Sequence, residues 1–304
     1  MLASFYALKK EGVIFIVLEF KSFYKQPTGN NELSKCKYLT RLDTYGCGCS
    51  HNCSYCYAKS LLDFRNLWNP LNPRVADINK IEKTINKIEP GTVVRLGGMT
   101  DCFQVFENAY RVTYKTIQLL NKRRIHYLIV TKSDMVASDK YLEILDKELA
   151  HIQISITSTD DKVAFKYEKA PSTSRRISAV EKLDSLGYDV QLRLSPFIPE
   201  LIDFDVLNSI KCNRILVEFL RVNTFIKRWF TEIDFDKYTL KQSNYLHLPL
   251  DEKIKQIEKI TGFKELTVCE DVTEHYNYWR DNVNPNKDDC CNLHYNEQKI
   301  RKVA

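Results

Sequence analysis

The chain has 304 residues, of which 44% are hydrophobic and 28% charged, with 9 Gly and 9 Pro. This composition is that of a folded globular protein, and it excludes a disordered, collagen-like or low-complexity chain. The formal net charge of +6 permits contact with nucleic acid without requiring it. The longest apolar run, at residues 13–18, is too short for a membrane span of about 20 residues, and no signal peptide is recognisable. We therefore predict a cytoplasmic protein without a membrane partner, in which the ten cysteines stay reduced.

The first part of the chain is a lead-in followed by one strand and a cysteine-rich stretch. Residues 1–37 have no clear pattern, and residues 21–35 form a polar loop. Residues 38–45 alternate as a strand does, and the cysteine-rich stretch occupies residues 46–58. A helix is predicted for residues 78–88, where Pro90 and Gly91 end it.

From residue 93 onward, strands and helices alternate. The predicted strands are residues 93–96, 125–131, 152–156, 190–194 and 214–219, and the predicted helices are residues 107–121, 138–149, 174–186 and 202–209. Six strands in this rhythm, near positions 40, 94, 128, 154, 192 and 216, predict an α/β fold with a parallel sheet, a partial (β/α)6 barrel. In such sheets the chemistry lies at the carboxyl ends of the strands. We expect residues 38–220 to form this barrel and residues 221–304 an appended C-terminal segment.

The strongest chemical signal is a cysteine triplet directly after the first predicted strand. Residues 46–57 read GCGCSHNCSYCY, so Cys49, Cys53 and Cys56 have the spacing C-x3-C-x2-C. Three thiolates on a four-iron cluster leave one iron open to an outside molecule. A structural zinc site instead needs four ligands, with a second pair farther along the chain. The triplet therefore favours an open iron–sulfur cluster, and a zinc site that uses His51 is the alternative.

This motif, with an aromatic residue before its last cysteine, resembles the signature of the radical SAM superfamily. The resemblance implies that Cys49, Cys53 and Cys56 hold a [4Fe–4S] cluster whose open iron chelates the amino and carboxylate groups of S-adenosylmethionine. It also implies that an electron, from a flavodoxin- or ferredoxin-type donor, splits the sulfonium. The resulting 5′-deoxyadenosyl radical would then abstract a hydrogen atom from the substrate.

A closer resemblance, over residues 40–200, is to the spore photoproduct lyase branch of that superfamily. Four stretches carry it, and each ends a predicted strand: residues 98–101 (GMTD), 130–133 (VTKS), 153–156 (QISI) and 193–196 (RLSP). The resemblance implies a set of cofactor-binding residues: Tyr55 near the adenine, Thr100 in the place of a cofactor-binding serine, Lys132 facing the methionine carboxylate, Ser155 at the ribose or carboxylate, and Asp101, Arg193 and Ser195. For the last three, a turn, a helix cap or a structural strand end is the alternative. Tyr57 would lie near the path of the radical.

One departure from the lyases concerns the hydrogen donor. The lyases have a donor cysteine where this chain has Gly98, and Cys102 lies nearby on the other side of Asp101. A glycine cannot return a hydrogen atom, so Cys102 or Tyr57 would have to act as the catalytic donor. We therefore expect a different substrate, a nucleic acid or nucleotide that undergoes repair or modification. The alternatives are radical modification of a peptide or small molecule, and a non-enzymatic zinc or iron–sulfur protein that binds nucleic acid.

The other cysteines allow a second metal site. Cys269, Cys290 and Cys291 lie in the C-terminal segment near two histidines, His275 and His294, and Cys47 adjoins the triplet. Adjacent Cys290 and Cys291 are awkward ligands for one metal, so buried, unreactive thiols are the alternative. Cys36 and Cys212 have no spacing signal, and we expect them to be packing residues.

Overall fold

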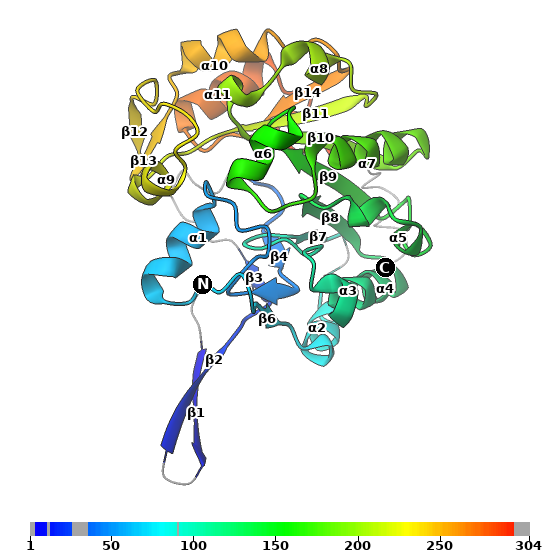
Figure 1. Ribbon diagram of the computed structural model, residues 1–304. Coiled ribbons are helices and arrows are strands. Elements are labelled where there is room, and N and C mark those ends of the chain that lie inside the picture. Colours follow the sequence, from blue (N-terminus) through cyan, green and yellow to red (C-terminus); the bar gives the residue numbers. More distant parts are fainter. Residues whose placement is uncertain (1–3, 11–12, 26–35, 90, 295–304) are drawn as a thin grey trace.

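The central element of the fold is one mostly parallel sheet. The computed structural model describes residues 4–10, 13–25, 36–89 and 91–294, so residues 26–35 of the loop predicted at 21–35, and Pro90, lie outside the described residues. In the described part of that loop the prediction is wrong, because Phe23–Lys25 is a strand. The sheet has eight strands in the order β14-β11-β10-β9-β8-β7-β4-β3 within these ranges (Figure 1). Its parallel strands are β4 (Thr40–Leu42), β7 (Val93–Leu96), β8 (His126–Thr131), β9 (Ala150–Ile156), β10 (Asp189–Phe197), β11 (Arg214–Phe219) and β14 (Glu265–Val268). The short edge strand β3 (Phe23–Lys25) is antiparallel to β4.

All six predicted strands are confirmed, and two more extend the sheet. β14 comes from the region expected to be an appended segment, where α10 (Leu250–Ile257), β14 and α11 (Thr273–Asn282) continue the alternation of helix and strand. β9 is buried along its whole length, as expected for a parallel strand that is covered on both faces. The predicted α/β partial barrel is therefore the observed fold.

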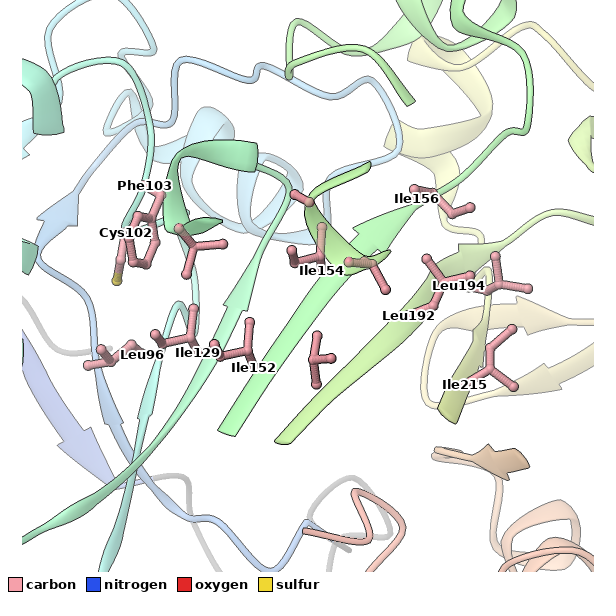
Figure 2. Close-up of a cluster of buried hydrophobic side chains, with 14 of the residues drawn as sticks. Leu96, Cys102, Phe103, Ile129, Ile152, Ile154, Ile156, Leu192, Leu194 and Ile215 are labelled. Carbon is pink, nitrogen blue, oxygen red and sulfur yellow. The ribbon is translucent and has the colours of Figure 1, made fainter. Parts of the chain in front are cut away.

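Helices cover one face of the sheet, here called the outer face (Figure 1). Its core consists of side chains that alternate along successive strands, such as Leu96, Ile129, Ile152 and Ile154 (Figure 2). The helices before β14 are α1 (Tyr57–Leu62), α2 (Ile78–Ile85), α3 (Glu107–Tyr110), α4 (Val112–Lys122), α5 (Asp139–Leu142), α6 (Asp161–Tyr167), α7 (Thr173–Ser185), α8 (Phe204–Asn208) and α9 (Thr224–Trp229). No helix in the described ranges is long and apolar enough to cross a membrane.

The opposite face, here called the inner face, carries the residues of the other parity. Val93, Leu128 and Leu216 form a second core there, and residues from both ends of the described chain pack against it: Tyr38, Cys290, Cys291 and Leu293. Arg95 has the parity of Val93, so polar and cationic side chains continue this face toward the carboxyl ends of the strands.

Two predicted helices are wrong in extent. The helix expected at 107–121 is two helices, because Arg111 adopts a left-handed conformation with φ of 55°. The Glu107 carboxylate caps the second one by accepting hydrogen bonds from the backbone N–H groups of Thr113 and Tyr114, both at 2.9 Å. The helix expected at 138–149 is only α5, because the Asp146 side chain accepts from the N–H of Glu148 and holds a turn instead.

Short elements complete the described ranges. Three two-stranded pairings lie outside the main sheet: β1 (Ser4–Lys10) with β2 (Val13–Glu19), β5 (Tyr45–Gly46) with β6 (Arg74–Val75), and β12 (Leu240–Gln242) with β13 (Tyr245–His247). The 3-10 turns are η1 (Asp63–Arg65), η2 (Asp134–Ala137) and η3 (Pro199–Leu201).

Candidate active site

The cysteine triplet lies on a tight loop between β5 and α1. Cys49 and Cys53 are buried and Cys56 is partly buried. Backbone hydrogen bonds fold the loop, from the N–H of Asn52 to the carbonyl of Cys49 at 3.0 Å and from the N–H of Cys56 to the carbonyl of Cys53 at 3.2 Å. Asn52, with φ of 40°, supplies a left-handed turn that asparagine tolerates better than most residues. The loop therefore brings the three thiols close enough together that Cys53 raises the pKa of Cys49 and Cys56 raises that of Cys53.

The chemistry of these thiols fits a cationic cluster. All three cysteines are free, and burial raises the pKa of each thiol, that of Cys53 to about 12. A buried thiolate needs positive charge to be stable, and iron supplies it. No group of three or more metal-ligating side chains in the described ranges is arranged around a single ion. A four-iron cluster is larger than an ion and takes one cysteine per iron.

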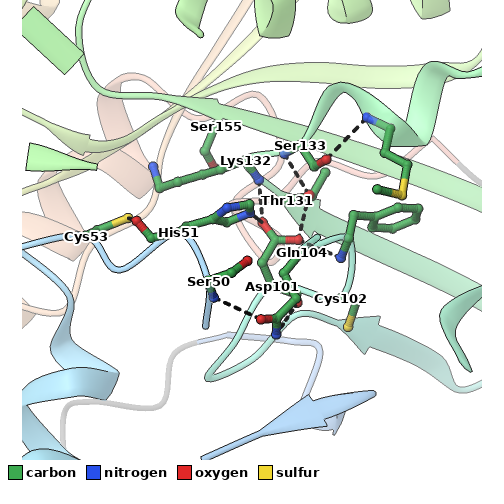
Figure 3. Close-up of polar contacts among 12 residues, drawn as sticks. Ser50, His51, Cys53, Asp101, Cys102, Gln104, Thr131, Lys132, Ser133 and Ser155 are labelled. Atoms are coloured by element: carbon green, nitrogen blue, oxygen red, sulfur yellow. Dashed lines mark hydrogen bonds and ion pairs between the residues drawn. The ribbon is translucent and has the colours of Figure 1, made fainter. Parts of the chain in front are cut away.

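Gln104 and Asp101 tie the cysteine loop to the loop after β7 (Figure 3). The Gln104 side chain accepts from the N–H of Ser50 at 2.9 Å and donates to the carbonyl of Asp101 at 3.2 Å. The Asp101 carboxylate accepts from the N–H of Lys132 at 2.6 Å and from the Thr131 hydroxyl at 2.8 Å. Three loops at the carboxyl edge of the sheet are thus fastened together by two buried polar side chains.

His51 lies against this network, with Nε2 3.2 Å from an Asp101 carboxylate oxygen. Burial opposes ionisation of Asp101, but His51 and the backbone N–H donors outweigh it and lower the pKa of the carboxyl. The His51 ring therefore contacts the Asp101 carboxylate, which supports a role for His51 in holding the loop.

Glu168, at the end of α6, connects the cysteine loop to the sheet. Its buried carboxylate accepts hydrogen bonds from the hydroxyl of Tyr55 and the guanidinium of Arg176, and lies 3.7 Å from Nζ of Lys132. Burial raises the pKa of this carboxyl, but Arg176 and Lys132 overcome it and lower the pKa to about 2. Glu168 therefore remains ionised inside the protein.

The segment around Glu168 also holds the cysteine loop through its backbone. The N–H of Ser54 donates to the carbonyl of Tyr167 at 2.9 Å, and the N–H of Lys169 donates to the carbonyl of His51 at 2.7 Å. Glu168 is not recognisable as a site residue from the sequence, since nothing in the spacing of residues 161–169 connects them to Tyr55 or Arg176.

Asp43 organises the loop at 97–100. Its buried carboxylate accepts from the N–H groups of Gly98 at 2.7 Å and Met99 at 3.0 Å. Burial raises the pKa of Asp43 to about 6, although these N–H groups oppose the rise. Gly97 is required here because its φ is +85° and a Cβ would lie 2.4 Å from the carbonyl of Val130.

Two tyrosine hydroxyls meet at Gly98. Tyr57 donates to the Gly98 carbonyl, and a Cβ on residue 98 would lie 1.9 Å from the hydroxyl oxygen of Tyr24. The Tyr24 hydroxyl in turn donates to Asp43 at 3.1 Å. The space that a side chain at position 98 would occupy is therefore taken by Tyr24.

The comparisons with known proteins agree with this geometry. The family model of the Radical SAM superfamily matches residues 44–211, more than half of the chain. The chain belongs to the radical SAM superfamily. It is 26% identical over 191 residues to an uncharacterized protein, MJ0683, of Methanocaldococcus jannaschii, an alignment that covers 60% of this chain and 69% of that protein.

Solved radical SAM structures share the fold at low identity. A spore photoproduct lyase mutant has a TM-score of 0.58 at 18% identity, over 80% of each chain. A second lyase mutant, with bound AdoMet and dinucleoside spore photoproduct, has a TM-score of 0.55 at 18% identity, over 81% of this chain and 76% of that one. Streptococcus suis SuiB bound to its precursor peptide SuiA has a TM-score of 0.53 at 12% identity, and 53% of its length is covered.

The remaining predicted residues of this radical SAM enzyme lie in two places, at the inner face of the sheet and on the loop after β7. At the inner face, Arg193 donates to Gln153 at 2.6 Å and to Glu218 at 2.5 Å, and the Ser195 hydroxyl donates to Glu218 at 2.8 Å. Ser155 is buried beside them on β9. These side chains are therefore close enough to form one wall.

Thr100 and Cys102 lie on the other side of the loop after β7. The Thr100 hydroxyl donates to the carbonyl of Tyr45. Cys102 is 1% exposed, packs in the outer-face core beside Phe103, and has its sulfur 3.7 Å from the carbonyl of Leu42 (Figure 2). This placement favours Tyr57 over Cys102 as the residue nearer to a substrate.

Proposed function

We propose that Cys49, Cys53 and Cys56 hold a [4Fe–4S] cluster and that this radical SAM enzyme acts on a nucleic acid or nucleotide. With S-adenosylmethionine bound, the cluster would supply reductive cleavage of that cofactor to a hydrogen-abstracting 5′-deoxyadenosyl radical, fed by a flavodoxin- or ferredoxin-type donor. Membership of an enzyme superfamily makes the non-enzymatic alternative wrong. The fold shared with a lyase that binds a dinucleoside photoproduct supports the substrate class.

The observation that carries the substrate proposal is an unpaired arginine beside Gly98. No residue in the described ranges forms a hydrogen bond or ion pair with the Arg41 side chain, and its Nε atom is buried without a partner. Its Cδ lies 3.2 Å from the position of a Cβ on residue 98, and it acts electrostatically on Tyr57. This partly buried guanidinium is therefore free to pair with an anion from outside the chain. A phosphodiester is a suitable anion, because guanidinium groups bind phosphate oxygens in pairs.

Arg221 adds a second feature suited to nucleotides. Its guanidinium carbon lies 5.6 Å from the ring centre of Tyr57 and 5.7 Å from that of Tyr245. Cations and aromatic rings arranged together bind bases by stacking and phosphates by charge. Arg221 itself is neutralised by Asp271 and Glu218, and we assign the phosphate to Arg41.

Replacing Arg41 by Gln tests this assignment. We expect binding of a short oligonucleotide to weaken about tenfold or more, since a charged hydrogen bond contributes about 1.5–3 kcal/mol. Binding of the uncharged methylphosphonate analogue should not change. Fluorescence anisotropy with both ligands measures the difference. Equal losses of affinity for the two ligands, or no loss, would show that Arg41 does not bind a phosphate.

Lys132 is expected to contribute to cofactor binding. Its Nζ donates to the carbonyl of Ser195 at 2.9 Å and lies 5.3 Å from the ring centre of Tyr55. Burial lowers its pKa, and Glu168 opposes that effect. Lys132→Ala should raise the dissociation constant for S-adenosylmethionine about tenfold or more while iron content stays normal. Calorimetry on the reconstituted protein checks this, with the exposed Lys166→Ala as the matched control; unchanged affinity would assign Lys132 a structural role only.

Spore photoproduct itself is expected to be a poor substrate. The lyases' donor cysteine is replaced by Gly98, and the Tyr24 hydroxyl occupies the space of its side chain. The reduced enzyme, given a spore-photoproduct dinucleotide, should form 5′-deoxyadenosine with little restored thymine. Chromatographic quantification of both products checks this.

A variant pair refines that measurement. Gly98→Cys alone should not restore repair, whereas Gly98→Cys combined with Tyr24→Ala opens the space and should release more thymine than either single change. Multiple-turnover repair by the wild-type enzyme would contradict the expectation. Loss of that repair in Cys102→Ala would identify Cys102 as the donor.

A further inference from the structure

Four cysteines outside the triplet meet at the inner face of the sheet. Cys36 precedes β4, Cys269 follows β14 directly, and Cys290 and Cys291 lie near the end of the described chain. All four pack in the inner-face core with Tyr38, Leu128 and Leu216, and all four are free. Cys291 raises the pKa of the Cys36 thiol, and Cys269 and Cys291 raise that of Cys290, as expected of thiols that pack together in this core. Three segments, one of them more than two hundred residues away from the other two in the chain, therefore bring their thiols to one place.

The backbone that presents these thiols is firmly held. The Asp289 carboxylate accepts from the N–H of Cys291 at 2.9 Å and receives a hydrogen bond from the Tyr38 hydroxyl. Gln191 on β10 donates to the carbonyl of Cys291 at 2.8 Å. The N–H of Cys269 donates to the carbonyl of Val217 on β11 at 2.8 Å. Cys269 and Cys291 are thus fixed to strands of the sheet, as a preorganised site requires.

Two buried arginines lie beside the thiols; Arg95 supplies positive charge there, and Arg193 shares its charge with Glu218. Arg95 acts electrostatically on Cys36 and Cys291, and Arg193 on Cys269 and Cys291. The Nε atoms of both arginines are buried and have no hydrogen-bond partner. A centre held by four thiolates carries net negative charge, so these guanidinium groups suit it better than they suit four neutral thiols.

We propose that Cys36, Cys269, Cys290 and Cys291 bind a second iron–sulfur cluster. The adjacent cysteines, which are awkward ligands for one ion, can bind different irons of a polynuclear centre. This agrees with the finding that no described group of ligands is arranged around a single ion. Four cysteine ligands leave no iron open, so this centre would serve structure or electron transfer, in contrast to the triplet. The two histidines and Cys47 are not part of it: His275 interacts with Lys253, and His294 with Glu265.

The test uses a variant in which the triplet is removed. The full-length protein with Cys49, Cys53 and Cys56 all changed to Ala is reconstituted anaerobically, and its iron, sulfide and zinc are measured. We expect about four irons and four sulfides per chain, with absorbance near 400 nm. Adding Cys290→Ala and Cys291→Ala should remove them, whereas adding Cys47→Ala or Cys212→Ala should not.

A measurement on the wild-type protein keeps the proposal testable if a variant does not fold. Wild-type protein should hold about eight irons, and only half of its reduced electron paramagnetic resonance signal should change when S-adenosylmethionine is added. Four irons whose whole signal changes would overturn the second cluster. So would one zinc per chain, or no metal, in the triplet variant. Cofactor cleavage depends on the triplet alone, so a failure of this proposal leaves the proposed function standing.

Discussion

Changing any one of Cys49, Cys53 and Cys56 to Ala is expected to abolish cleavage of S-adenosylmethionine and leave a folded protein. The cleavage needs all three thiolates on one cluster, whereas the loop contributes only Cys53, Tyr55 and the partly buried Cys56 to the outer-face core, and most of that core comes from the strands and helices. Product analysis for 5′-deoxyadenosine after anaerobic reduction measures the loss. Circular dichroism checks that the α/β fold is intact.

Cys212→Ala is the matched control, because Cys212 is also buried but lies outside the triplet. Its thiol donates to the carbonyl of Arg214 at 3.3 Å. This variant should retain full cleavage. If each triplet variant kept full iron and full cleavage, the assignment of the cluster to these residues would be wrong. Loss of cleavage with only about half of the iron lost is the result expected when a second cluster is also present.

Changing Glu168 to Ala is expected to be the most destabilising single substitution at the site. The Arg176 guanidinium is fully buried, and Glu168 is the carboxylate that pairs with it. Breaking a buried ion pair from one side costs about 3–5 kcal/mol, because the other charge is left uncompensated. Tyr55 would also lose its hydrogen-bond acceptor. The free energy of unfolding in denaturant, measured without metal, checks the magnitude.

Glu168→Gln keeps the shape of the side chain and should lose less stability than Glu168→Ala. The exposed ion pair of Glu148 and Arg124, with its N and O atoms 2.5 Å apart, provides a matched control. Glu148→Gln should change the free energy of unfolding by at most about 1 kcal/mol. Comparable effects at the two positions would mean that water reaches Arg176. Because the segment around Glu168 also hydrogen-bonds to the cysteine loop, cluster content should fall together with stability.

Much of the fold could be predicted because local pattern and tertiary structure agree. Apolar, β-branched strands such as β8 and β9 are recognisable from residues alone, since a parallel strand buried on both faces needs no polar alternation. The predicted helices that were wrong in extent lie where a side chain accepts hydrogen bonds from backbone N–H groups. Glu107 caps a second helix, and Asp146 holds a turn, and neither event leaves a periodic trace in the sequence.

The sequence by itself determined the alternation of strands and helices, the family resemblance and the cysteine triplet, because close spacing along the chain forces Cys49, Cys53 and Cys56 onto one loop. Only the tertiary structure decided which distant residues meet. Glu168 accepts hydrogen bonds from Tyr55 and Arg176, Tyr24 fills the space beside Gly98, and the free thiols of Cys36 and Cys291 pack in one core. Such contacts join residues that are far apart in the chain, and the packing of the sheet, rather than spacing or periodicity, brings them together.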